Sequence, residues 1–423
     1  MNLPIPLSLL FCFVHSLVAI AGAGEISMEL PDGDEIAVSH YAAEGDTRLV
    51  WLPSEFGISP RQEPTARALA ARGIDTWIPD LHSTYFIPPG RYSLNEVDPA
   101  AVSAIIQHAT EDGHSVFLLA GGRTNALALR ALRHYQLHHE DTARVRGIIS
   151  IGPRLFLRTP QGGEAERFLP IASASNVPVF ILQPRDAGGF WRVSKVAEKL
   201  ASGGAPTYTQ VLQDVSDGFN LRDEFSPQEE RVTRALPDKL LTAMRLLGFH
   251  DGLPGTAAPL AGEDLAPEAN RGSALLKPYP ANRKTPTLQL ADLQGKTHDL
   301  GDYAGKVVVL NFWATWCPPC VEELPSLQRL QQARKARGLE ILTVDVGESR
   351  EDIAQFLADL ETQVDFPVLV DSDGEQLHRW GVHAFPTTLL LDRSHRIRYA
   401  GFGAFAWDGP EVLEIIDRLL AGS

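Results

Sequence analysis

The sequence predicts an α/β protein built from two domains. Its 423 residues are too many for one ordinary domain. Short apolar runs alternate with amphipathic stretches in two separate regions, and this alternation favours parallel strands covered by helices. Between these regions lies a stretch rich in Pro, Gly and Ala without an apolar period, which is typical of a linker.

The overall composition is that of a folded protein with an excess of acidic groups. Apolar residues make up 44% of the chain and charged residues 22%, which distinguishes it from a disordered tail. The formal net charge is -15 at pH 7. Because nucleic acids and anionic lipid surfaces require a basic footprint on their partner, we expect no nucleic-acid partner. Composition leaves the oligomeric state open.

The start of the chain is typical of a secretory signal peptide. No residue from Leu3 to Gly24 carries a permanent charge, and the apolar centre ends in small residues that contain two overlapping A-x-A cleavage sites, at residues 19–23. We therefore predict a signal peptide over residues 1–24 and export to the periplasm. The alternative is a retained membrane anchor with the protein facing the periplasm, since the uncharged stretch is just long enough to span a bilayer.

The first domain is expected over residues 25–250. Its predicted strands are Leu49–Leu52, Thr76–Ile78, Ser115–Leu119, Gly147–Ile151, Val177–Leu182 and Tyr208–Leu212. The helices expected between and after them are Pro60–Arg72, Pro99–Thr110, Thr124–His134, Trp191–Ala201 and Pro237–Leu247. Strands and helices that alternate at this spacing predict a mostly parallel sheet covered on both faces.

The linker is expected over residues 251–285 and the second domain over residues 286–423. Predicted strands of the second domain are Lys306–Phe312, Glu340–Val346, Phe366–Val370, Thr387–Leu391 and Ile397–Tyr399. Predicted helices are Cys317–Arg337, Arg350–Leu360 and Glu411–Leu420. The first of these helices follows a continuous apolar strand and begins at a cysteine.

Cysteine usage points to one short stretch, NFWATWCPPCVEELP. The chain has three cysteines, and Cys12 lies in the predicted signal peptide, so that cleavage leaves only Cys317 and Cys320. A zinc site is disfavoured, because tetrahedral zinc needs four ligands and the histidines of this region have no ligand-like spacing. A structural disulfide is also disfavoured, since closing so small a loop gains little chain entropy. The remaining interpretation is catalytic thiol–disulfide exchange, which needs no cofactor besides the cysteine pair.

The position of the pair supports this interpretation. Sulfurs at the start of a helix and three residues further on lie on one side of its first turn. The helix dipole lowers the pKa of the first thiol, so we expect Cys317 to attack and Cys320 to resolve. The ring of Trp316 is expected to leave one sulfur exposed and shield the other. Because Pro318 and Pro319 have no N–H to offer a thiolate, we predict a reducing centre rather than a strongly oxidising one.

The stretch GKVVVLNFWATWCPPCVEELPSL resembles the thioredoxin-like reductases of the TlpA/ResA type, and the resemblance covers roughly residues 286–420. Pro325 lies where thioredoxin helices have a kinking proline, and Asn311 lies where TlpA-like proteins commonly have Asn. Glu323 matches an acidic residue near the resolving thiol, and the resemblance implies that it assists proton transfer there. Pro386 matches the cis-proline of the family, which implies that the backbone of Phe385 faces the client chain.

This resemblance also implies partners. The chain is expected to be an enzyme that exchanges disulfides with client proteins, and Trp316, Phe385 and Pro386 would bind the client. A membrane or periplasmic electron donor would restore the cysteine pair. The competing hypothesis is a binding or scaffold protein in which the pair is incidental. A peroxidase of the peroxiredoxin kind is excluded, because Ala314 holds the place of the required threonine.

The first domain resembles the α/β-hydrolases in its topology and in three loops. SVFLLAGGRTNALALRAL, at Ser115–Leu132, matches their strand, sharp turn and helix, but Gly122 stands in the place of the nucleophile. Asp186 lies where the family has its acid, and Asp217 replaces the histidine. An acid without a base or a nucleophile cannot transfer an acyl group, which predicts an inactive domain kept for binding. An active hydrolase that uses another serine remains the alternative; the candidates are Ser54, Ser83 and Ser150.

Overall fold

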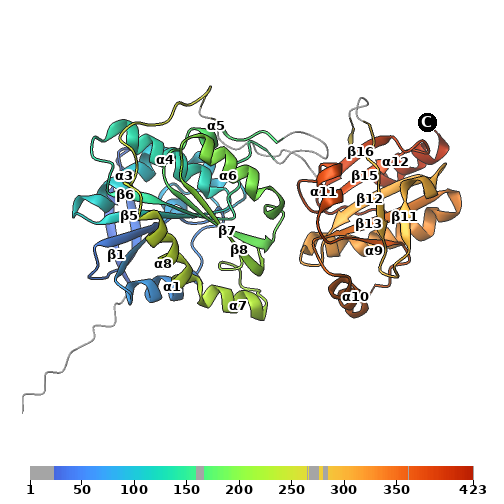
Figure 1. The fold of residues 1–423 in the computed structure, drawn as a ribbon, viewed down its shortest axis with the longest axis horizontal. Helices are drawn as coiled ribbons and strands as arrows, with labels where there is room; N and C mark the ends of the chain where they lie inside the picture. Colours follow the sequence, from blue (N-terminus) through green and yellow to red (C-terminus); the bar gives the residue numbers. More distant parts are fainter. Residues whose placement is uncertain are drawn as a thin grey trace, which may run out of the picture.

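The computed structural model describes residues 23–158, 166–263, 265, 276–279, 284–360 and 362–422. Two α/β domains lie side by side, each built around its own sheet (Figure 1). Most of the predicted signal peptide lies outside the described residues, and its last two positions begin the first strand. In the described part of the chain, no helix is both long and apolar enough to cross a membrane.

The first domain contains an eight-stranded sheet in the order β1-β2-β4-β3-β5-β6-β7-β8. Strand β2 pairs antiparallel with β1 on one side and with β4 on the other, and the remaining neighbouring pairs in this sheet are parallel. The strands are β1 Ala23–Glu29, β2 Glu35–Tyr41, β3 Thr47–Trp51, β4 Ile74–Pro79, β5 Ser115–Gly121, β6 Val145–Ile151, β7 Val179–Asp186 and β8 Thr207–Ser216. The central strands are buried on both faces, as expected for a parallel sheet covered by helices.

Helices cover both faces of this sheet and form two apolar cores. One core includes side chains of α3, α4 and α6, and the other includes side chains of α1 and α8. The helices are α1 Gln62–Ala70, α2 Leu81–Thr84, α3 Pro99–Glu111, α4 Thr124–His138, α5 Pro170–Ser173, α6 Val193–Ser202, α7 Pro227–Arg234 and α8 Leu236–Leu247, with short 3₁₀ turns η1 Ser93–Glu96 and η2 Phe190–Arg192.

Sequence reasoning missed the hairpin formed by β1 and β2. Strand β2 places Ile36, Val38 and Tyr41 in the core between more exposed residues, and a turn with Gly33 at a φ of 87° joins it to β1. An Asp-Gly turn between alternating segments is a hairpin signal that could have found it. The hairpin extends the sheet beyond β4 at one edge.

The second domain contains a six-stranded sheet in the order β14-β13-β12-β15-β16-β9. Its strands are β9 Lys277–Pro278, β12 Val307–Trp313, β13 Leu339–Val346, β14 Val368–Asp371, β15 Thr387–Leu391 and β16 Ile397–Phe402, and a separate small pair consists of β10 Gln289–Ala291 and β11 Thr297–Asp299. The helices are α9 Pro318–Arg334, α10 Arg350–Asp359, α11 Glu375–Trp380 and α12 Pro410–Ala421, with 3₁₀ turns η3 Leu300–Tyr303 and η4 Lys335–Arg337. This arrangement is a thioredoxin fold.

The described ends of the predicted linker are packed on the domains. Leu253 is buried, and its backbone oxygen accepts a hydrogen bond of 2.8 Å from Thr142. At the other end, β9 pairs with β16 at the edge of the second sheet. In both contacts backbone groups of the linker form the hydrogen bonds, which a composition rich in Pro and Gly does not reveal.

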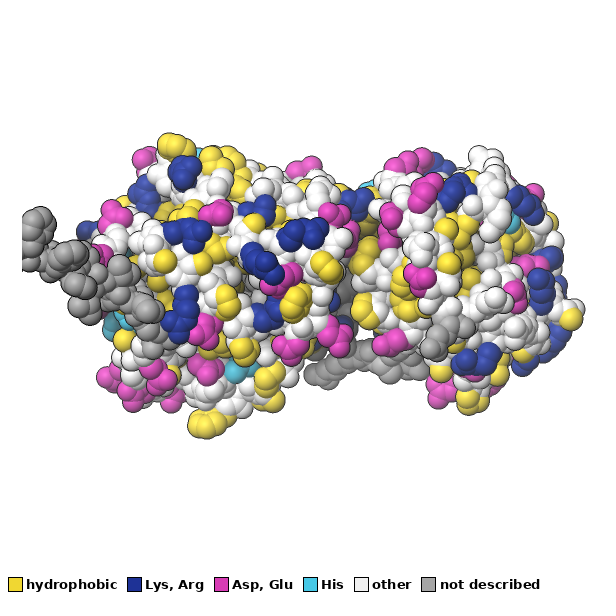
Figure 2. All heavy atoms as spheres, turned by 90° about the horizontal axis from the view of Figure 1, so that it is seen from below, with side chains coloured by type: hydrophobic (Ala, Val, Ile, Leu, Met, Phe, Trp, Pro, Cys, Tyr) yellow, Lys and Arg dark blue, Asp and Glu magenta, His cyan; other side chains and the backbone are white. Residues whose placement is uncertain are grey.

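Charged groups of both signs are mixed over the surface. On the face shown in Figure 2, Lys and Arg side chains are interspersed with Asp and Glu on both domains. One cation is instead buried in the first domain. Nε of Arg48 donates to Oδ1 of Asp75 at 2.7 Å, its two terminal nitrogens reach the carboxylate of Asp112, and its guanidinium lies over the ring of Trp77.

We expect Arg48→Ala to lower the free energy of unfolding of the first domain by about 3–5 kcal/mol, because it leaves the buried Asp75 with only the imidazole of His40 as a partner among these side chains. Urea denaturation at neutral pH measures the loss. Arg67→Ala is the matched control, since it removes an exposed pair with Glu63 and should cost less than about 0.5 kcal/mol. Equal losses in the two variants would contradict the role given to the buried ion pair.

Candidate active site

Cys317 and Cys320 form a disulfide at the start of α9. Their Cα atoms are 5.3 Å apart, which lies within the range that a disulfide spans. Cys317 is the residue that caps the helix, and Pro318 and Pro319 occupy its first two helical positions. Prolines fit there because the first amides of a helix have no partner within it. The structure therefore places the pair as the sequence predicts.

Both sulfur-bearing side chains are buried, and this corrects the expectation that Trp316 leaves one of them exposed. Cys317 retains 5% of its exposure and Cys320 retains none. Both belong to the apolar core of the domain, against which Trp316 and Phe385 also pack. The rings of Trp316 and Phe385 meet edge to face, with centroids 5.5 Å apart. Phe385 comes from a distant loop, so its contact with Trp316 was not visible near the cysteines in the sequence.

The loop before β15 lies beside the cysteine loop. The peptide bond between Phe385 and Pro386 is cis, which is the isomer implied by the resemblance. Strand β15 begins directly afterwards and pairs antiparallel with β12, with Thr387 opposite Phe312. Because β12 ends one residue later and leads to Cys317, this pairing brings the proline loop and the disulfide to one edge of the sheet.

Glu323 is a buried carboxyl on the first turns of α9, and only 1% of its surface is exposed. Its Oε2 accepts hydrogen bonds from Nε1 of Trp407 at 3.0 Å and from the backbone N–H of Phe405 at 3.3 Å. Burial raises the pKa of Glu323 to about 7, although these hydrogen bonds act in the opposite direction. A carboxyl with this pKa can release or take up a proton near neutral pH.

Asn311 links this carboxyl to the central strand. It is fully buried in β12, and its Nδ2 donates to Oε1 of Glu323 at 2.7 Å and to Oγ1 of Thr388 at 2.9 Å. An aspartate at this position would place a second acid against Glu323, whereas the amide supplies a donor. The structure thus connects two residues that the resemblance singled out separately.

A second carboxyl group holds the cysteine loop and was missed by sequence reasoning. Glu348 follows β13 and accepts hydrogen bonds from the backbone N–H of Thr315 at 2.7 Å and from its hydroxyl at 2.5 Å. Burial raises the pKa of Glu348, and burial together with Glu348 raises that of Asp345 well above its usual value. The signal was the position of Glu348 at the carboxyl end of a strand beside β12, where parallel sheets place functional residues.

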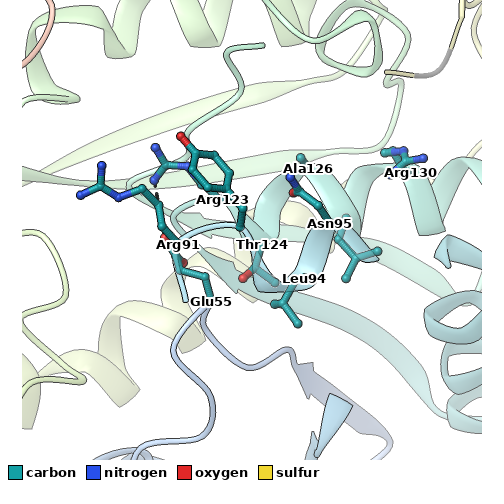
Figure 3. A pocket seen from close by; sticks show the side chains of 10 residues that line it. Glu55, Arg91, Leu94, Asn95, Arg123, Thr124, Ala126 and Arg130 are labelled. Carbon is teal, nitrogen blue, oxygen red and sulfur yellow. Dashed lines mark ion pairs between the residues drawn. The ribbon is translucent and has the colours of Figure 1, made fainter. Parts of the chain in front are cut away.

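The first domain has the strand, turn and helix that the sequence predicts around Gly122. This glycine follows β5 with a φ of 51°, in the left-handed region. A Cβ atom built on it would lie 3.0 Å from Oε2 of Glu55, so that a carboxylate occupies the space where a nucleophile would project. Glu55 also lines a small pocket at the start of α4, together with Arg91, Arg123 and Arg130 (Figure 3).

The other two triad positions hold acids in different surroundings. Asp217 lies at the position where the resemblance expects the histidine, and it forms an ion pair with Arg154. Burial raises the pKa of Asp186 to about 6 at the end of β7. The three positions therefore carry a glycine and two carboxyl groups. The serine nucleophile and the histidine base of a hydrolase triad are both missing from them.

The three alternative serines have structural contacts. The hydroxyl of Ser54 donates to the carbonyl of Gly57, that of Ser83 donates to Asp80, and Ser150 is buried within β6. The structure does bring His82 to within 3.0 Å of Ser93, a pair that sequence reasoning did not find. Ser93 donates its proton to the carbonyl of Glu55 at 2.7 Å, so it accepts a hydrogen bond from the imidazole rather than giving up a proton to it.

Metal chemistry has no cluster to support it in the part of the chain that the structure describes. No group of three or more His, Cys, Asp or Glu side chains there could hold a metal ion. His298, the first histidine of the second domain along the sequence, hydrogen bonds to Asp292 and Tyr303. The chemistry of the second domain is therefore best sought at the disulfide, Glu323 and the proline loop.

Fold and site together define a thioredoxin-like domain with a paired-cysteine centre. The AhpC/TSA family model matches residues 281–400. The thiol-disulfide oxidoreductase ResA of Geobacillus thermodenitrificans is 39% identical over 113 residues, which are 27% of this chain and 64% of that protein. ResA of Bacillus subtilis is 38% identical over 112 residues, which are 26% of this chain and 62% of that protein. The C-terminal third is therefore similar in sequence to ResA, and the chain spans less than two thirds of the length of these relatives.

Two solved structures are also similar to this part of the chain. The exposed lipoprotein thioredoxin of Streptococcus pneumoniae is 29% identical, and the match covers 31% of this chain and 98% of that one with a TM-score of 0.29. A secreted thiol-disulfide isomerase from Corynebacterium glutamicum is 26% identical over 36% of this chain and 96% of that one, with a TM-score of 0.32.

The raised pKa of Glu323 predicts a loss of stability as the pH rises. The folded state binds the proton more tightly than the unfolded state, so this contribution is fully present below about pH 4.5 and is lost as the pH rises through about 7. The loss amounts to about 3 kcal/mol. Urea denaturation of the parent and of Glu323→Gln across this range should show a flatter pH dependence in the variant. Identical slopes would show that Glu323 does not titrate as inferred.

Proposed function

We propose that this protein is an exported thiol:disulfide oxidoreductase that reduces disulfides in client proteins through Cys317 and Cys320. The observation that carries the proposal is the bonded pair at the start of α9, next to a buried carboxyl with a pKa near neutrality. Export agrees with the apolar, uncharged start of the sequence. The proposed reaction needs no cofactor beyond the cysteine pair.

In the reduced protein, the thiolate of Cys317 attacks one sulfur of a client disulfide. The client bond breaks, and the departing client sulfur takes up a proton. A mixed disulfide then joins Cys317 to the client. Cys320 loses its proton, attacks Sγ of Cys317 and releases the second client sulfur as a thiol. Two electrons have passed to the client, and the pair is left as the disulfide.

The surrounding residues have distinct roles in this proposal. The first turn of α9 stabilises the thiolate of Cys317 through the helix dipole. Glu323 accepts the proton of Cys320 as the second step proceeds, for which a pKa of about 7 is suited. Trp316, Phe385 and Pro386 bind the client, and a membrane or periplasmic electron donor reduces the pair again.

The thiol chemistry predicts different effects for the two cysteines. Cys317→Ala should abolish turnover of a protein disulfide, because the attacking sulfur is gone. Cys320→Ala should accumulate a mixed disulfide with the client, because nothing resolves it. Insulin reduction and non-reducing electrophoresis with mass spectrometry measure the two outcomes. Parent protein that turns over no disulfide at all would favour the competing view of a scaffold with an incidental cysteine pair.

The two prolines set the reduction potential. A helix-capping side chain accepts from the amides of the second and third helical residues, and Pro319 removes the first of these donors. Pro319→Ala should supply this missing N–H donor and stabilise the thiolate of Cys317 by about 1.5 kcal/mol. The potential should then rise by about 30 mV. Equilibration with glutathione buffers measures it, with Pro325→Ala, which lies further along α9, as the control. An unchanged potential would show that the amide does not reach the sulfur.

A further inference from the structure

A hollow in the first domain has a positively charged lining. It lies at the start of α4, beside the turn that lacks a nucleophile, and encloses about 300 Å³, part of which is open solvent (Figure 3). Among the side chains that line it, three are arginines, Arg91, Arg123 and Arg130, and one is a carboxylate, Glu55. Three positive charges and one negative charge leave a net charge of two positive units, in a chain whose formal net charge is -15. Such a local excess of cations in an acidic protein favours an anionic ligand.

Arg123 is held in place by contacts that leave its hydrogen-bond donors unused. Its guanidinium carbon lies 5.0 Å from the ring centroid of Tyr92. Its Nη1 lies 3.7 Å from Oε1 of Glu55, which is an ion-pair distance but is too long for a hydrogen bond. Among the described residues, none accepts a hydrogen bond from this side chain. The side chain retains 13% of its exposure and lines the hollow, so an anion that enters the hollow can reach it.

Arg91 brings a second positive charge to the same end of the hollow. Its side chain is exposed, and no carboxylate pairs with it in the part of the chain that the structure describes. Figure 3 shows Arg91 and Arg123 next to each other. Burial, Arg154 and Arg91 each lower the pKa of Arg123, although Glu55 acts in the opposite direction. The cations therefore repel one another, and a bound anion relieves this repulsion.

The charge and the walls of the hollow determine which anion fits. Guanidinium groups donate pairs of parallel hydrogen bonds to the oxygens of carboxylate and phosphate groups. A net charge of two positive units matches a phosphate group, which carries close to two negative charges at neutral pH, whereas a single carboxylate offsets half of it. Three further lining residues, Leu94, Ala126 and Leu127, are apolar. They form a wall against which a small organic group can pack.

We infer that this hollow is a binding site for a phosphate group, which Arg91 and Arg123 hold beside the start of α4. The group is either free phosphate or the end of a small phosphorylated compound whose organic part packs against the apolar wall. The inference gives the first domain a binding function of its own. This function does not depend on the thiol chemistry proposed for the second domain.

Isothermal titration calorimetry of the full-length protein measures the binding. Inorganic phosphate and phenyl phosphate are the probes, and acetate is the monovalent comparison, all at one ionic strength because salt screens exposed charges. Phosphate should bind at least about tenfold more tightly than acetate, because it offsets both excess charges. Tighter binding of phenyl phosphate would identify a phosphorylated organic compound as the ligand, and equal or weaker binding would identify free phosphate.

Three variants assign the binding to the hollow. Arg123→Gln should weaken phosphate binding by at least about tenfold, the loss expected for a hydrogen bond from a charged donor. Arg91→Gln changes an exposed side chain and should weaken it by about threefold, which keeps the test decisive if Arg123→Gln fails to fold. Arg67→Gln, on the exposed surface of α1, is the matched control that should leave the affinity unchanged.

Three results would overturn the inference. They are the absence of phosphate binding at millimolar concentrations, acetate binding as tight as that of phosphate, and an affinity that neither variant of the hollow changes. Insulin reduction by the same preparations tests the proposed function separately, so the two can fail independently.

Discussion

The pairing of β12 with β13 on one side and β15 on the other is the constraint on which the site depends. Strand β12 is buried along its whole length, so neither neighbour can shift register without moving an apolar face out of the core. This fixed register brings three loops to one edge: the cysteine loop after β12, Glu348 after β13 and the proline before β15. No one of these loops is near another in sequence.

Near the cysteine loop, burial determines the direction in which the pKa values of the carboxyl groups shift. Glu323 accepts three hydrogen bonds, which by themselves would favour the charged form. Its pKa nevertheless rises to about 7, because burial in the apolar core outweighs them. Burial likewise outweighs the hydrogen bonds from Thr315 and raises the pKa of Glu348, whereas burial and Glu348 act together to raise the pKa of Asp345. The disulfide is thus flanked by carboxyls that favour protonation, in a protein whose net charge is strongly negative.

The first domain has the backbone turn that the sequence predicts at Gly122, without a nucleophile on it. The turn at Gly122 retains a left-handed backbone, yet Glu55 fills the space beyond it and an arginine bonds Asp217. Such a domain is free to serve another purpose, since function depends on the site rather than on the fold. Arg192 of this domain donates to the carbonyl of His383, so the domain lies in contact with the redox domain.

The sequence by itself determined the two α/β domains, the helix that starts at the cysteines and the residues Asn311, Glu323 and Pro386, because apolar periodicity and a local motif are encoded in short stretches. The sequence also showed that Gly122 stands at the position expected for the nucleophile. Only the tertiary structure decided that Phe385 packs against Trp316 next to the cysteines, that Glu348 accepts hydrogen bonds from Thr315, and that Arg192 donates to the carbonyl of His383 in the proline loop. These contacts join residues between about 30 and 190 positions apart, and only the packing of strands and domains brings such residues together.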